Sequence, residues 1–274
     1  MKQLKIEHLR HLNLKDSRST NILKRLGLFI GLFRYWYFYT LVLRRQPVLI
    51  YTPGSSGTAS ISWSLRKCNV FTIHLHKLSY YKDKTLLDVL CSRLSHGSNL
   101  RHVFAFMFYR CMLKGKPVKI ITGVRNPVDK NFSQLFQKYY THFKDKPLPE
   151  VYDFFIESFE HDDVDVWFNK EFVEMFGIDI EQNPFPERGW LHIVKDNVHI
   201  LVFKFEIPDN IIESNIKYFL GLSEFKMGRH GVTKSIMYED FKKYYVYPDS
   251  FKDMIYGFDY SKYFNYRGKK DVSC

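Results

Sequence analysis

The chain has 274 residues, of which 45% are hydrophobic and 18% are aromatic, and its formal charge is +12. This length and content provide one large α/β domain with an appendage, and they exclude a chain without a packed core. The positive charge favours an anionic partner, which could be a nucleotide, a nucleic acid, an acidic glycan or an anionic lipid.

The four cysteines give no sign of a disulfide framework or a metal site. They are neither closely paired nor spaced as metal ligands: Cys68, Cys91, Cys111 and Cys274. We therefore expect reduced thiols in a reducing compartment and no bound metal. Asn131-Phe-Ser133 matches the glycosylation acceptor pattern, but it lies inside the nucleotide site proposed below, which favours a cytoplasmic protein. No cleavable signal peptide is evident at the start of the chain.

The first 46 residues form a basic and apolar segment, separate from the domain expected over residues 47–274. The apolar run Leu26–Leu43 lies between two basic pairs and predicts a helix over about 20–45. Arg34 near its centre argues against a membrane span. We expect a helix that either lies on a membrane surface, where aromatic and basic flanks are favoured, or packs on the domain.

The first part of the domain predicts three buried strands separated by helices. In chain order these are a strand over 47–52, a helix over 57–67, a strand over Val70–Leu75, two helical stretches within 84–114 broken near Ser95-His-Gly97, a strand over Lys119–Val124, and a helix over Asp129–Tyr140.

The second part predicts one long helix, a hairpin and a helical tail. Its elements are a helix over Leu148–Phe176 stopped by Gly177, a β-hairpin of Trp190–Val194 and His199–Phe205, a helix over Asn210–Leu220, and a helical, aromatic tail over 238–264. Strands that alternate with helices indicate a parallel, doubly wound sheet. Ligands bind such sheets at the carboxyl ends of the strands.

Two motifs follow predicted strands. The loop Gly54-Ser-Ser-Gly-Thr-Ala59 comes after the apolar run Val48–Ile50. Gly54 and Gly57 permit close backbone approach, so that N–H groups can converge on an anion at the helix N-terminus, with hydroxyl groups from Ser55, Ser56 and Thr58. The alternative is an ordinary turn with helix-capping residues. The absence of Gly-Lys-Ser/Thr argues against a kinase or NTPase.

The second motif places Arg125 at the end of a buried strand and Ser133 eight residues later. Pro127 and Asp129 suit the first turn of a helix, on which Ser133 lies about two turns along. The arginine fork and the serine hydroxyl can then share one oxyanion. The alternative is an exposed arginine and an ordinary helical serine. Two anion sites predict a nucleotide with two separate anionic groups.

These motifs resemble those of sulfotransferases that use 3′-phosphoadenosine 5′-phosphosulfate (PAPS). The closer resemblance is to bacterial putative capsular polysaccharide synthesis proteins of the sulfotransferase type, and it covers residues 47–265. It rests on the following segments: Gly54–Ala59, His74-Leu-His76, Arg125-Asn-Pro127, Trp167-Phe-Asn-Lys-Glu171 and Phe176-Gly-Ile-Asp179. The resemblance implies a P-loop-like, three-layer α/β domain with a central parallel sheet.

The resemblance also implies a function, which is transfer of a sulfuryl group from PAPS to a hydroxyl of a carbohydrate, such as a capsular or surface polysaccharide. The loop Gly54–Ala59 would hold the 5′-phosphosulfate, and Arg125 and Ser133 the 3′-phosphate. His76 at the end of a strand would take the hydroxyl proton, with His74 as the second candidate, although either could be a structural histidine. The protein would work in the cytoplasm. Any contact with the membrane would be peripheral and at its inner face.

One residue departs from the family pattern. Ser55 stands where the family has a lysine that contacts the transferred group. Lys67, Lys77 or another basic residue could replace that cation, or activity could be lost. A catalytically inactive nucleotide- or glycan-binding scaffold is therefore the first alternative. A nucleic-acid-binding protein is the second, although the basic residues are spread throughout and form no known recognition motif.

Overall fold

The computed structural model of the protein describes residues 47–54, 57–86, 88–89, 100–161, 164–179, 185–230, 238, 240–241 and 247–266. Four sets of sequence-based predictions lie outside these residues, namely the helix over 20–45, the loop serines Ser55 and Ser56, the helix break near residues 95–97, and the thiols of Cys91 and Cys274. Among the described helices, none is long and apolar enough to cross a membrane.

A five-stranded sheet forms the centre of the fold, in the order β2-β1-β3-β5-β4. Its strands are β1 (Val48–Tyr51), β2 (Thr72–Leu75), β3 (Val118–Val124), β4 (Trp190–Lys195) and β5 (Val198–Lys204). The pairs β1–β2, β1–β3 and β3–β5 are parallel, and β4 pairs with β5 antiparallel. The sheet is thus mostly parallel, and its antiparallel pair is the predicted hairpin, in which a two-residue turn joins β4 to β5.

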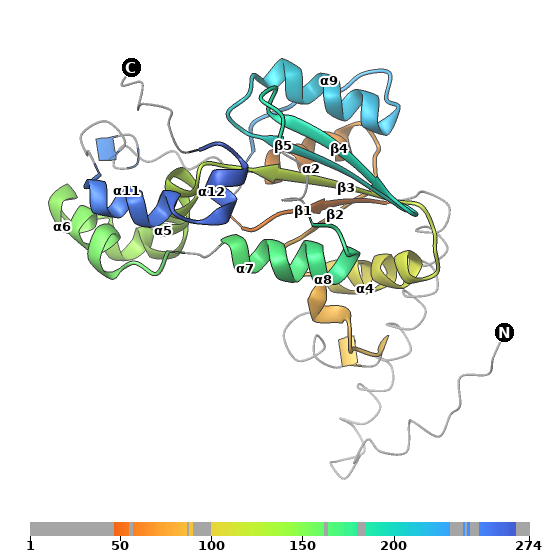
Figure 1. Cartoon of the computed structure of the whole chain (residues 1–274), viewed down its shortest axis with the longest axis horizontal. Coiled ribbons are helices and arrows are strands. Elements are labelled where there is room, and N and C mark those ends of the chain that lie inside the picture. The colour runs from red at the N-terminus through yellow and green to blue at the C-terminus, as the bar shows by residue number, and fades with distance from the viewer. Residues whose placement is uncertain are drawn as a thin grey trace, which may run out of the picture.

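Helices cover both faces of the sheet, so the fold is a layered α/β structure (Figure 1). One face carries α2 (Ala59–Lys67) and α9 (Asp209–Leu220), and the other carries α4 (Leu100–Leu113), α7 (Val164–Phe168) and α8 (Glu174–Phe176). Residues that alternate along β1 divide between the two cores. Val48 and Ile50 pack toward α2, whereas Leu49 and Tyr51 pack toward α4.

A second group of helices lies beyond the carboxyl ends of the strands (Figure 1). It consists of α5 (Pro127–Phe143), α6 (Leu148–Asp153), α11 (Asp249–Tyr256) and α12 (Asp259–Tyr263). Phe132, Phe136, Phe155, Phe241 and Phe251 form much of a separate aromatic cluster here. This cluster holds α5 in place at the edge of the sheet where ligands bind in such folds.

The prediction of one long helix over 148–176 was wrong. The segment contains α6, the π-helical turn η3 (Phe154–Ser158), α7, the π-helical turn η4 (Asn169–Val173) and α8. The backbone is extended at Phe159 (ψ 126°), whose buried ring contacts Phe155 and His161 in the aromatic cluster. This break turns the chain from the aromatic cluster back to the sheet. Gly177 ends α8 in the left-handed conformation, as predicted.

The other predicted elements that lie within the described residues are confirmed with small shifts in their ends. The hairpin, the helix ending at Gly221, and the strand–helix pairs around both motifs are present. The short 3₁₀ turn η2 (Ser79–Tyr81) follows β2 and was not predicted. The tail is helical in α11 and α12, which are separated at Gly257 and Phe258.

Candidate functional site

Three connections meet at the carboxyl edge of the sheet. They are the loop after β1, the turn after β2 and the start of α5 after β3. From β1 the chain crosses one face of the sheet through α2 and enters β2, on one side of β1. From β2 it crosses the opposite face through α4 and enters β3, on the other side of β1. The strand order therefore reverses between β1 and β3, and a crevice at such a point is the usual ligand site of an open α/β sheet.

The described part of the first loop leaves the N-terminus of α2 without a side-chain cap. Thr58 occupies the capping position, but its side chain makes no capping hydrogen bond, and the first turn contains no acidic residue. The Thr58 hydroxyl instead lies 3.1 Å from Thr52 Oγ1 and 3.2 Å from His74 Nε2. Gly57 has φ +74°, where another residue would be strained. An anion at this helix end is favoured by the orphan N–H groups and the helix dipole.

Two further loop positions were predicted to contact the anion. A methyl group added at Gly54 would meet no atom within 4 Å, so a ligand can approach its backbone closely. Ala59 is the first residue of α2 and is half-buried. Its place in the first turn puts its N–H among the groups that could face an anion.

The predicted partners Arg125 and Ser133 are neighbours in the structure. The Arg125 guanidinium donates a hydrogen bond from Nη1 to Ser133 Oγ at 2.9 Å. The Tyr238 hydroxyl, 3.2 Å from Ser133 Oγ, completes a cluster of three polar groups. Tyr238 was not predicted as a site residue, because it lies 105 residues from Ser133 and no local sequence signal marks it.

The backbone at Arg125 is held on both sides. The Tyr260 hydroxyl accepts a hydrogen bond from the Arg125 N–H at 3.0 Å and donates one to the Arg125 carbonyl at 2.8 Å. Burial raises the pKa of Tyr260, which keeps this hydroxyl protonated. Asn126 caps α5 through Val128 N–H, and its own N–H donates to Glu206 at 2.7 Å. The arginine is thus presented from a rigid turn.

The two predicted histidines lie together, with ring centroids 5.0 Å apart. His76 Nδ1 is 2.8 Å from the Thr52 carbonyl oxygen, which can only accept a hydrogen bond. Neutral His76 therefore carries its proton on Nδ1 and presents Nε2 as an acceptor, the tautomer that a general base at Nε2 requires. His74 instead faces the Thr58 hydroxyl of the loop.

A buried lysine that the sequence analysis did not single out joins the two motifs. Lys130 is 1% exposed and lines a cavity of about 290 Å³ together with Gly54 and His76. It precedes Ser133 by three residues, so both lie on the same side of α5, and this spacing was the available signal. Lys77 also lines this cavity, whereas Lys67 lies elsewhere, 3.6 Å from the centre of the Trp63 ring.

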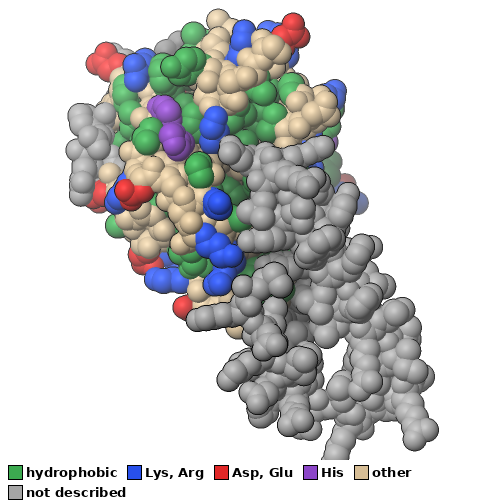
Figure 2. Space-filling view, turned by 90° about the vertical axis from the view of Figure 1, so that its right-hand side faces the viewer, with side chains coloured by type: hydrophobic (Ala, Val, Ile, Leu, Met, Phe, Trp, Pro, Cys, Tyr) green, Lys and Arg blue, Asp and Glu red, His purple; other side chains and the backbone are tan. Residues whose placement is uncertain are grey.

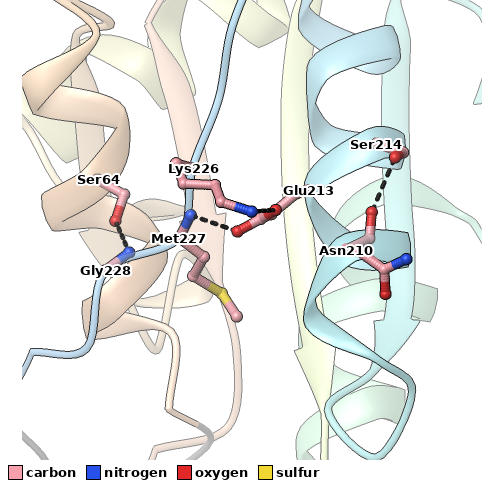
Figure 3. A network of polar contacts seen from close by, with 7 residues as sticks. All are labelled: Ser64, Asn210, Glu213, Ser214, Lys226, Met227 and Gly228. Atoms are coloured by element: carbon pink, nitrogen blue, oxygen red, sulfur yellow. Dashed lines mark hydrogen bonds and ion pairs between the residues drawn. The ribbon is translucent and has the colours of Figure 1, made fainter.

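A second cavity, of about 650 Å³, lies along the outer side of α2 and includes Trp63 and Lys67. The segment after α9 forms one wall, where Gly228 N–H donates to Ser64 and Met227 N–H donates to Glu213 (Figure 3). Glu213 also pairs with Lys226 at 2.9 Å (Figure 3). The ring of His230 stacks on Trp63, and the Lys67 amine lies over the same ring. These contacts give Trp63 a packing role.

The described residues therefore combine a helix N-terminus without a side-chain cap, an arginine–serine pair and a histidine-lined cavity at one edge of the sheet. None of the groups of His, Cys, Asp and Glu side chains within these residues could hold a metal ion. Comparisons of the chain with family models, curated proteins and solved structures found no match.

Proposed function

We propose that this protein is a sulfotransferase with a P-loop-like fold, which moves a sulfuryl group from PAPS to a hydroxyl of a capsular or other surface polysaccharide. The observation that carries the proposal is the 2.9 Å contact between Arg125 and Ser133, which follow β3, together with the N-terminus of α2 after the neighbouring strand β1, where Thr58 makes no capping hydrogen bond. A nucleotide with phosphate-type groups on both sides of its ribose matches these two positions. We further propose that the protein acts in the cytoplasm at the inner face of the membrane.

Each part of the donor has a candidate partner. The backbone of the loop from Gly54 to Ala59, with the dipole of α2, would hold the 5′-phosphosulfate. Arg125 would bind the 3′-phosphate with two parallel hydrogen bonds, aided by the Ser133 hydroxyl. The Tyr260 hydroxyl already fixes the Arg125 backbone through its N–H and its carbonyl. The entropic cost of ordering Arg125 when the nucleotide binds should therefore be small.

The acceptor hydroxyl would attack the sulfur in line with the bond to the 5′-phosphate. A new oxygen–sulfur bond forms while the sulfur–oxygen bond to the phosphate breaks, and the phosphate oxygen leaves with the electron pair. His76 Nε2 would take the hydroxyl proton. Lys130, which lines the cavity beside Gly54, is the best-placed cation to stabilise the charge that develops on the leaving phosphate.

Nucleotide choice tests the assignment directly. We expect 3′-phosphoadenosine 5′-phosphate (PAP) to raise the melting temperature more than ATP at equal concentration, because only PAP offers a group to Arg125 and Ser133. The measurement is thermal unfolding with PAP, ATP or single-stranded DNA. Equal shifts from PAP and ATP, or no shift from PAP, would show that the cofactor assignment is wrong.

Single-stranded DNA in this assay examines the nucleic-acid alternative. The described face at the amino ends of the strands also carries lysine and arginine side chains, in several separate places (Figure 2). On this face the described basic side chains do not form one continuous strip of the kind that follows a phosphate backbone. We expect DNA to give the smallest shift of the three ligands.

The inactive-scaffold alternative is favoured by one observation, the serine at position 55. We expect Ser55→Lys to raise the turnover of the wild type. The same substitution should restore turnover to a Lys130→Met variant, because a lysine at position 55 and Lys130 would each place positive charge near the leaving phosphate. Methionine has a similar volume, so Lys130→Met should keep the fold, whereas PAP should bind more weakly because its 5′-phosphate is the leaving group that Lys130 would contact. The assay is sulfuryl transfer to a panel of glycans. Inactivity of both wild type and Ser55→Lys, with PAP still bound, would establish the scaffold.

A further inference from the structure

The cavity beside His76 is a small, preformed site between four parts of the chain. Its volume is about 290 Å³. It is lined by Pro53 and Gly54 after β1, His76 and Lys77 after β2, Lys130 on α5, and Val164, Val166, Trp167, Lys170 and Glu171 on α7 and η4. Ligand pockets span roughly 300–1,000 Å³, so this one lies at the small end and suits a single sugar unit.

Glu171 fixes the wall that carries His76. This carboxylate is 1% exposed and accepts hydrogen bonds from the Tyr51 hydroxyl, from the backbone N–H groups of Leu78 and Ser79, both at 2.9 Å, and from the Ser79 hydroxyl at 2.5 Å. Burial and the charge of Glu171 raise the pKa of Tyr51 well above its ordinary value, so the phenol remains the donor. The turn that follows His76 is therefore held rigidly.

Trp167 also lines the cavity and contacts the segment that carries His76. Its indole N–H donates to the His76 carbonyl at 2.5 Å, and its ring packs on Tyr51 and Phe172. The ring is half-buried, so part of it faces the cavity that it lines. An indole held in this way provides a flat apolar surface next to the histidine.

Positive side chains outnumber negative ones among the described lining residues. Three lysines line the cavity, and two of them, Lys77 and Lys170, are exposed to solvent. Among the described lining residues Glu171 is the one carboxylate, and its oxygens are already engaged by four donors. If Lys130 stabilises the transferred group, the charges of Lys77 and Lys170 remain available to contact the acceptor.

We propose that the cavity binds an acidic sugar, a uronic acid whose carboxylate contacts Lys77 and Lys170 while one of its hydroxyls faces His76. The position of the hydroxyl rests on the proposed sulfotransferase function, whereas binding of the carboxylate depends only on the cavity. A uronic acid fits the size of the cavity, the apolar surface of Trp167 and the excess of positive charge. This names the acceptor class as an acidic glycan.

The experiment compares sugars that differ in one group. The probes are methyl glucuronide with methyl glucoside, and methyl galacturonide with methyl galactoside, titrated by NMR into the full-length protein with and without PAP. We expect at least one uronide to bind roughly tenfold more tightly than its neutral partner, since a hydrogen bond to a charged group contributes this much. The preference should shrink at high salt.

Variants assign the preference to the cavity. The double variant Lys77→Gln with Lys170→Gln should lose the preference for the uronide while PAP affinity is retained. The matched control is Lys67→Gln with Lys217→Gln, which removes the same charge from exposed lysines of the cavity along α2 and should keep the preference.

Two outcomes would overturn the proposal. One is that no uronide binds more tightly than its neutral partner, including the case in which neither binds. The other is that both double variants reduce the preference equally, which would show a general effect of net charge. Failure of the nucleotide assignment is seen separately, as absence of PAP binding in the same samples.

Discussion

His76→Ala is expected to lower sulfuryl transfer by roughly 10²–10⁴, the usual contribution of a positioned general base. The hydrogen bond between Nδ1 and the Thr52 carbonyl orients the ring and leaves Nε2 as the proton acceptor. The imidazole would contact the acceptor and not the nucleotide, so PAP affinity should be unchanged. The measurements are turnover with a polysaccharide acceptor at saturating PAPS, and a PAP titration of the same variant.

His74→Ala is the matched control for this experiment. His74 shares the wall with His76 but contacts the Thr58 hydroxyl, so its loss should have a smaller effect on turnover and act through the loop. Because His76 is exposed, His76→Ala should also keep the melting temperature of the wild type. If His76→Ala retains full activity, the base is another group in the crevice, and His74 is the first to test.

The fold could be predicted where local signals agree. Gly177 and Gly221 end helices at the predicted residues, and the pattern around Asp196-Asn197 marks the hairpin. The long helix over 148–176 could not be predicted correctly, because the break at Phe159 is made by tertiary packing. No proline or glycine marks it, and the extended backbone allows the phenylalanine ring to join the aromatic cluster.

The candidate site divides in the same way. Arg125 and Ser133 are close in sequence and on one strand–helix unit, so their contact could be predicted from spacing. Tyr238 and Tyr260 reach the same place from the end of the chain, and only the packing of α12 and its neighbours brings them there. Lys130 was overlooked because a lysine in a helix is ordinarily solvated, whereas this one is almost completely buried.

Arg125→Ala and Ser133→Ala are expected to weaken PAP binding specifically. Removing the serine hydroxyl deletes a hydrogen bond to a charged group, which contributes about 1.5–3 kcal/mol. This corresponds to a loss of roughly tenfold to a hundredfold in affinity. Arg125→Ala should cost more, because it removes a bidentate ionic contact to the 3′-phosphate and also the hydrogen bond that Arg125 donates to the Ser133 hydroxyl.

Adenosine 5′-phosphosulfate, which lacks the 3′-phosphate, separates a specific loss from a general one. Its affinity should change little in either variant, because the loop and α2 hold the 5′ group. Arg110→Ala, which removes an exposed arginine from the last turn of α4, is the control for net charge and should bind both ligands as the wild type does. A similar loss for PAP and adenosine 5′-phosphosulfate would indicate a folding defect at the Arg125 turn. A loss for PAP alone would place the 3′-phosphate at the Arg125–Ser133 pair and leave the loop as the site of the 5′ group.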